Sequence, residues 1–87
     1  MHEMSLIHDL MRKIETIARD QNAVKVVGVK VRLGALAHIS ADHFREHFEE
    51  ESKGTIADGA RLEVELLTDE NDPQAQDIML DSVEVED

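Results

Sequence analysis

The segment of this 87-residue sequence that most limits its fold is 25–34, KVVGVKVRLG, in which apolar residues alternate with Gly28, Lys30 and Arg32. Side chains that alternate in this way predict a β-strand with one buried face. The residues expected on the buried face are Val27, Val29, Val31 and Leu33. A one-sided strand needs partner strands beside it and an apolar layer over its buried face.

An amphipathic helix is predicted at the start of the chain. From Met4 to Ala18, apolar residues recur at intervals of three and four, and charged residues occupy the other side. This spacing is typical of a helix that packs one face against a core. Ser5 is the candidate N-cap of this helix, and a start one or two residues earlier is the alternative.

A second helix is predicted over residues 40–54, SADHFREHFEEESKG. Ser40 suits the N-cap and Gly54 suits the C-terminal cap. Phe44 and Phe48, four residues apart, form the apolar stripe of this helix. The sequence contains no other aromatic side chains of the Phe, Trp or Tyr type, so the rest of the core is expected to be aliphatic.

Two further strands complete the predicted fold. Residues 61–67, RLEVELL, place Leu62, Val64 and Leu66 on one face, whereas residues 77–87 change the parity of their apolar positions, which predicts a bulge or twist. Between them, residues 68–76 form an acidic, proline-bearing linker. The order α-β-α-β-β predicts one α+β domain over residues 1–87, with two helices packed on one face of a three-stranded sheet.

Composition excludes several classes of function. The net charge is -11, and the chain has no cysteine, so disulfides and thiolate metal sites are excluded. An acidic chain without a basic stripe is not expected to bind nucleic acid, and no span approaches membrane length. We expect a cytoplasmic protein whose small aliphatic core is compatible with a weak homo-oligomer.

Residues His43 to His47 spell H-x-x-E-H, the inverted zinc-protease signature. Two imidazoles four residues apart on a helix can chelate one metal ion. A protease would also need a third ligand and a substrate cleft, for which an 87-residue chain has little room. The simplest interpretation is a solvated helix face, and adventitious metal binding by this pair is favoured over catalysis.

The other histidines carry weaker signals. His8 lies on the first predicted helix and His38 in the loop GALAHIS, and the sequence gives neither of them a catalytic partner. The run Glu49–Glu51 is typical of a solvated helix face.

The first three residues form a different kind of candidate site. A free α-amine on Met1, the backbone nitrogen and imidazole of His2, and a donor from Glu3 can close small chelate rings around one ion. Ni(II) and Cu(II) favour this planar, nitrogen-rich ligand set. Because His2 is too bulky for routine removal of the initiator methionine, Met1 is expected to remain and supply the amine.

The sequence resembles the HypA/HybF family of nickel-delivery proteins in hydrogenase maturation. The resemblance rests on MHEMSL at the N-terminus, KVVGVKVRLGAL, GTIADGARLEVE and the final LDSVEVED. It implies the same two-helix, three-stranded fold, and it implies that Met1, His2 and Glu3 bind nickel. Family members carry a zinc module with two Cys-x-x-Cys pairs where this chain has residues 68–76, so no structural zinc is expected here.

The resemblance implies a metallochaperone and not an enzyme. Ni(II) would be passed on with a GTPase of the HypB type to the large subunit of [NiFe]-hydrogenase or its maturation complex, and in some organisms to urease. The alternative is an interaction module of the same machinery that binds a GTPase or a sibling subunit and transfers no metal. The remaining hypothesis is the hydrolase suggested by His43 and His47.

Overall fold

The computed structural model describes residues 2–86, and it describes side chains from residue 5 onward. Two helices and three strands follow each other in the predicted order. They are α1 (His2–Asp20), β1 (Lys25–Leu33), α2 (Ala41–Ser52), β2 (Arg61–Leu66) and β3 (Ile78–Glu86).

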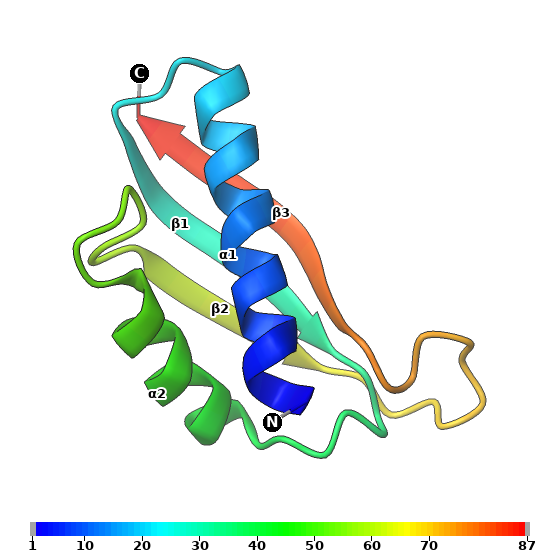
Figure 1. Ribbon diagram of the computed structural model, residues 1–87. Coiled ribbons are helices and arrows are strands. Elements are labelled where there is room, and N and C mark those ends of the chain that lie inside the picture. The colour runs from blue at the N-terminus through cyan, green and yellow to red at the C-terminus, as the bar shows by residue number, and fades with distance from the viewer. Residues whose placement is uncertain (1, 87) are drawn as a thin grey trace.

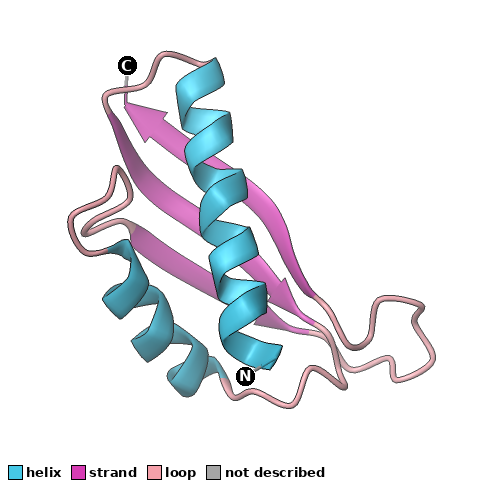
Figure 2. Ribbon diagram, viewed as in Figure 1, coloured by secondary structure: helices cyan, strands magenta, loops and turns pink. Residues whose placement is uncertain are grey.

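The three strands form one mixed sheet with the order β2-β1-β3. β1 is parallel to β2, and α2 lies in the crossover that joins them, whereas β1 is antiparallel to β3. Both helices lie on the same side of the sheet (Figures 1 and 2), and the opposite face carries no helix. The predicted α+β fold with two helices on one face of a three-stranded sheet is therefore confirmed.

The core lies between the helix layer and the sheet. Ile7 and Ile14 of α1 and Phe44 of α2 are completely inaccessible to solvent, and Phe48 is 1% exposed. On the sheet side, directly paired residues present apolar side chains to the same face, as in the pairs Val29–Val83 and Val31–Leu80. The small core thus joins every helix and strand.

Two β-bulges set which side chains reach this core. In β1, Val27 is an extra residue relative to β3, so Val26 is fully buried and Val27 is only partly buried. The prediction that Val27 lies on the buried face was wrong, because strict alternation is broken at the bulge. In β3 the extra residue is Asp81, which confirms the bulge predicted from the change of parity in this strand.

The uncovered face of the sheet is built from charged residues. Lys30 and Arg32 of β1 lie 3.8 and 3.2 Å from the carboxylate of Asp81 at the bulge, and Arg32 also lies 3.4 Å from Glu65 of β2. Arg61 of β2 pairs with Glu84 of β3 across the central strand. Lys30 and Arg32, the two cations predicted on the outer face of β1, are therefore both in ion pairs.

The helix boundaries match the predicted caps at α2 but not at α1. Ser40 is the N-cap of α2 and accepts a hydrogen bond from the His43 amide at 3.1 Å. Gly54, with φ of 76°, follows the C-cap, as expected of a C-terminal glycine. The helix α1 starts at His2, so the prediction of Ser5 as its N-cap was wrong.

The segment between β2 and β3 folds back on the end of β1. The Gly34 amide donates to the Asp77 carbonyl at 2.9 Å, and the Leu36 amide donates to the Ala75 carbonyl at 2.7 Å. A Cβ atom added to Gly34 would lie 2.2 Å from the Ala75 carbonyl oxygen, so only glycine fits here. These contacts hold the linker against the body of the domain.

Candidate metal centre

The predicted nickel ligands lie at the start of α1. His2 and Glu3 form part of its first turn, and their side chains lie outside the described residues, as does Met1 altogether. Whether Met1, His2 and Glu3 converge on one ion therefore stays a prediction. What the structure describes is the helix end that carries them.

The body of α1 is fixed by burial, and Ile7 is the first buried residue among the side chains that the structure describes. The residues of α1 that are less than 9% exposed are Ile7, Leu10, Met11, Ile14 and Ala18. The first amide groups of an α-helix have no acceptor within the helix. Since α1 starts at His2, the backbone nitrogens of His2 and Glu3 are among the amides that α-helical hydrogen bonding leaves available.

The helix end also favours negative charge at this position. The macrodipole places a partial positive charge at the N-terminus of a helix, which stabilises anions there. Deprotonated amide nitrogens are anionic ligands, so the first turn of α1 is a suitable place for the chelate predicted from the sequence. The fixed body of α1 holds this turn at one edge of the helix layer (Figure 1).

His43 and His47 are brought together on α2. Their Nε2 atoms are 3.0 Å apart, and their ring centroids are 4.6 Å apart with the planes inclined at 44°. The i,i+4 spacing on the helix accounts for this approach. The adjacent Phe44 and Phe48 are buried, which fixes the side of α2 that faces the core.

The remaining two histidines are also placed. His8 Nε2 lies 2.9 Å from Glu51 Oε1, an ion pair between α1 and α2 when the imidazole is protonated. The sequence gave no signal for this contact, since it depends on how the two helices pack. His38 is exposed in the loop before α2, with φ of 59°.

No group of three or more His, Cys, Asp or Glu side chains is arranged to hold a metal ion within the part of the chain whose side chains are described. A hydrolytic zinc centre at His43 and His47 would therefore need a third protein ligand from outside that part. Catalytic zinc sites use three protein ligands and keep one open position.

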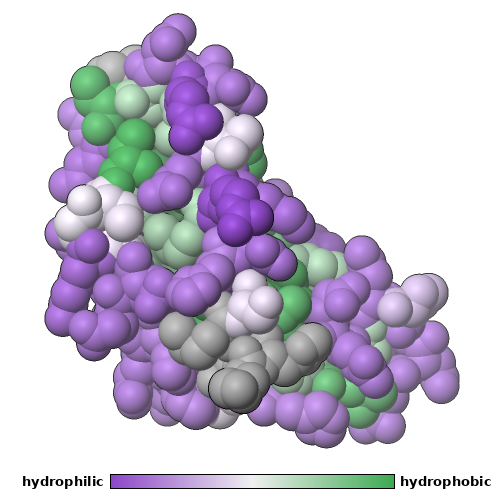
Figure 3. Space-filling model, in the orientation of Figure 1, coloured by the Kyte–Doolittle hydropathy of each residue, from purple (hydrophilic) through white to green (hydrophobic). Residues whose placement is uncertain are grey.

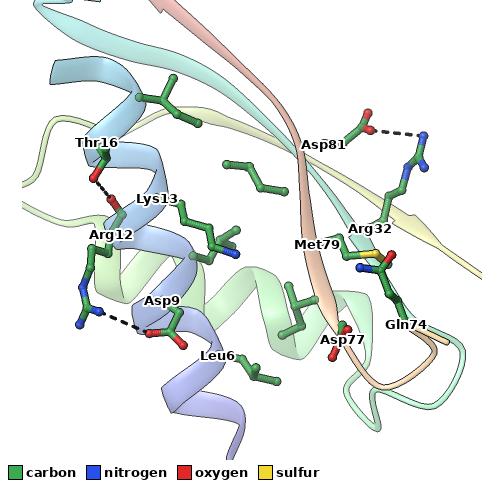
Figure 4. Close-up of a pocket in the computed structure, with 14 residues that line it drawn as sticks. Leu6, Asp9, Arg12, Lys13, Thr16, Arg32, Gln74, Asp77, Met79 and Asp81 are labelled. Atoms are coloured by element: carbon green, nitrogen blue, oxygen red, sulfur yellow. Dashed lines mark hydrogen bonds and ion pairs between the residues drawn. The ribbon is translucent and has the colours of Figure 1, made fainter. Parts of the chain in front are cut away.

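A groove with a volume of about 890 Å³ lies between α1 and β3 and is shown in Figure 4. Leu6 and Asp9 of α1 line it on one side, and Asp77 and Met79 line it on the other. Its lining contains no histidine and mixes charged with apolar side chains. The groove shows that the segment before β3 and the first turns of α1 border the same space.

The face of the molecule that carries the helices is largely polar. The space-filling view in Figure 3 shows hydrophilic residues over most of the helix side, with small apolar areas between them. Within the described residues, 2–86, no helix is long and apolar enough to cross a lipid bilayer.

Comparison of this fold with solved structures indicates the class of protein. The chain is similar to the solution structure of the Ni metallochaperone HypA from Helicobacter pylori, with a TM-score of 0.78 and 18% sequence identity, over 97% of each chain. At this identity the similarity establishes the fold: a small α+β domain of the kind found in that metallochaperone.

Sequence comparison then gives the family. Residues 1–71 match the family described as "Hydrogenase/urease nickel incorporation, metallochaperone, hypA", and the chain belongs to this HypA family. Curated relatives named "Hydrogenase maturation factor HypA" include those of Methylocella silvestris, 39% identical over 70 residues, and Archaeoglobus fulgidus, 39% identical over 66 residues. These matches cover 80% and 76% of this chain, and 62% and 60% of the relatives' lengths. The chain thus matches about three fifths of each relative.

Proposed function

We propose that this protein binds Ni(II) and delivers it during the maturation of [NiFe]-hydrogenase, with urease as a further recipient. The observation that carries this proposal is the family match over residues 1–71, which includes the Met1-His2-Glu3 segment. Nickel is the cargo of the protein, and the proposed activity is ligand exchange and not catalysis.

The proposed site consists of the Met1 amine, the amide nitrogen and imidazole of His2, and a donor from Glu3. Such a chelate needs the N–Cα–C–N torsion of each ring to lie near planarity. A helical residue has ψ near -42°, so the first turn of α1 must open slightly when the ion binds. This adjustment breaks no buried packing among the described side chains, because the core contacts of α1 begin at Ile7.

A site at the end of a helix also suits transfer. A planar complex leaves both axial positions open, so ligands of an acceptor can approach before the donor ligands leave. The proposed partners are a GTPase of the HypB type and the hydrogenase large subunit or its maturation complex. We place the exchange in the cytoplasm.

Calorimetric titration with Ni(II) tests the site. His2→Ala should weaken Ni(II) binding by at least tenfold, since losing even an outer-shell partner of a metal ligand costs roughly 10–100-fold in affinity. The matched control is His8→Gln, which removes another imidazole from the same helix and should leave the affinity unchanged. Equal Ni(II) affinity in wild type and His2→Ala would contradict the proposed site.

The same variants separate the proposal from its alternative, a module that binds the maturation machinery without carrying metal. That alternative predicts no specific Ni(II) binding by the wild type and equal capture of a HypB-type GTPase by wild type and His2→Ala. Stoichiometric, His2-dependent Ni(II) binding would exclude it.

A further inference from the structure

We propose that His43 and His47 form a second transition-metal site on α2, a two-imidazole chelate for Ni(II) that lies beside the first turn of α1. The observation behind it is the 3.0 Å hydrogen bond between the two Nε2 atoms, which a bound ion would replace by coordinating both nitrogens. This site uses side chains of α2 and is distinct from the proposed ligands at Met1, His2 and Glu3.

The separation of the nitrogens fits one metal ion. Imidazole nitrogens bind such ions at about 2.0–2.1 Å, and two of them 3.0 Å apart then subtend roughly 90–100° at the ion. This is the angle between neighbouring ligands in planar and octahedral complexes, which Ni(II) and Cu(II) adopt. It is narrower than the tetrahedral angle of structural Zn(II) sites.

The local charge favours a cation. The helix α2 carries five carboxylates, which are Asp42, Glu46, Glu49, Glu50 and Glu51, and the only basic side chains on it or at its C-cap are Arg45 and Lys53. Arg45 is turned away, because its guanidinium donates a 2.8 Å hydrogen bond to the Leu62 carbonyl of β2. The helix that carries the two imidazoles therefore has an excess of negative charge, which attracts cations.

The packing of the helices places the pair next to the start of α1. His43, His47 and Glu51 follow each other at intervals of four along one side of α2. Glu51 contacts His8 of α1, and both helices start at the same end of the molecule (Figure 1). His47 lies one turn before Glu51, and His43 lies two turns before it. Since Glu51 contacts His8, these two histidines lie level with the beginning of α1.

This position suggests what the second site does, and this step rests on the proposed function. Two imidazoles leave the other coordination positions of Ni(II) to water, so the hydrated ion can bind without deprotonation of an amide. The terminal chelate requires amide deprotonation and forms more slowly. The pair therefore holds Ni(II) close to the terminal site before the ion enters it.

The site is tested by imidazole NMR signals during Ni(II) titration of the His2→Ala protein. Six-coordinate Ni(II) at the pair is paramagnetic, so the signals of His43 and His47 should broaden together, before those of His8 and His38. In that background, His43→Gln and His47→Gln should each weaken this binding by at least roughly tenfold, because a chelate exceeds its single ligands by a large factor.

The matched control is His38→Asn, which removes an exposed imidazole from a left-handed backbone position that asparagine tolerates. It should leave the response of His43 and His47 unchanged. Uniform broadening of all imidazoles would overturn the second site. If the His43 and His47 signals broaden with Ni(II) in the wild type but not in the His2→Ala protein, these histidines belong to the terminal site and the proposal of a separate site is wrong.

The holding role has its own readout. In protein with an intact His2, the planar Ni(II) absorption should appear more slowly in the His43→Gln/His47→Gln double variant and should reach the same final intensity. An unchanged rate would overturn the role while leaving the terminal site standing. The proposed function is tested separately: it predicts that the single variant His2→Ala loses the planar Ni(II) absorption altogether.

Discussion

The two parts of α1 differ in what they contribute. From Ile7 to Ala18 the helix is packed against the sheet and α2, and its buried side chains carry no metal-binding chemistry apart from the thioether of Met11. The first turn holds the proposed nickel ligands, and it precedes Ile7, the first buried residue among the described side chains. This division suggests that stability and metal binding can be changed independently in one helix.

The largest effect on stability is expected in the packed part of α1. Ile14→Ala removes a fully buried side chain and should lower the free energy of unfolding by about 2–5 kcal/mol. Chemical denaturation measures this loss. Ni(II) affinity of the folded fraction should not change, because the first turn is untouched.

The matched control for this variant is Ile17→Ala, at a position on the same helix that is only partly buried. It should lower the free energy of unfolding clearly less than Ile14→Ala does. Equal losses in the two variants would show that the described packing of α1 is wrong.

An intermediate effect is expected at the contact between β1 and the linker. Gly34→Ala forces a methyl group against the Ala75 backbone and should lower the free energy of unfolding by about 1–3 kcal/mol. Thermal or chemical denaturation measures the loss. Since Gln74 and Asp77 border the same groove as Leu6 and Asp9, this variant also tests whether the linker helps to position the start of α1.

Gly28→Ala is the matched control for the linker contact. Its new methyl group would meet the ends of the Arg61 and Glu84 side chains, which can move aside. A loss at Gly28 as large as that at Gly34 would contradict the proposed role of the backbone contact.

The smallest effect is expected at the helix caps. Ser40→Ala removes the acceptor of the His43 amide and should cost about 0.5–2 kcal/mol, measured by denaturation. Ser5→Ala should be neutral or slightly stabilising, because Ser5 lies inside α1 and alanine is the better helix former. If Ser5→Ala lowered the free energy of unfolding more than Ser40→Ala, Ser5 would be the N-cap of α1 after all.

The sequence was sufficient to predict the parts of the fold that depend on periodicity. The apolar stripe of α1, the caps of α2 and the bulge in β3 all follow from local spacing, and the structure confirms them. The start of α1 was placed too late, because an N-cap at Ser5 would begin the helix at Leu6, whereas the described helix begins at His2.

Features that depend on tertiary contacts could not be predicted. The burial of Val26 in place of Val27 results from a bulge in pairing with β3, a strand more than 50 residues away in sequence. The contact of His8 with Glu51 depends on helix packing. By contrast, the approach of His43 to His47 follows from i,i+4 spacing, which is why the sequence alone singled out this pair.

The central claim is that the first three residues bind nickel through nitrogen donors that include the amine of Met1. The most direct test is visible absorption during Ni(II) titration of protein that begins at Met1, compared with the same protein carrying a short extension before Met1. The account predicts a d–d band of a planar complex that saturates near one equivalent and is absent from the extended protein. A band of equal intensity in both proteins, or no band in either, would contradict it.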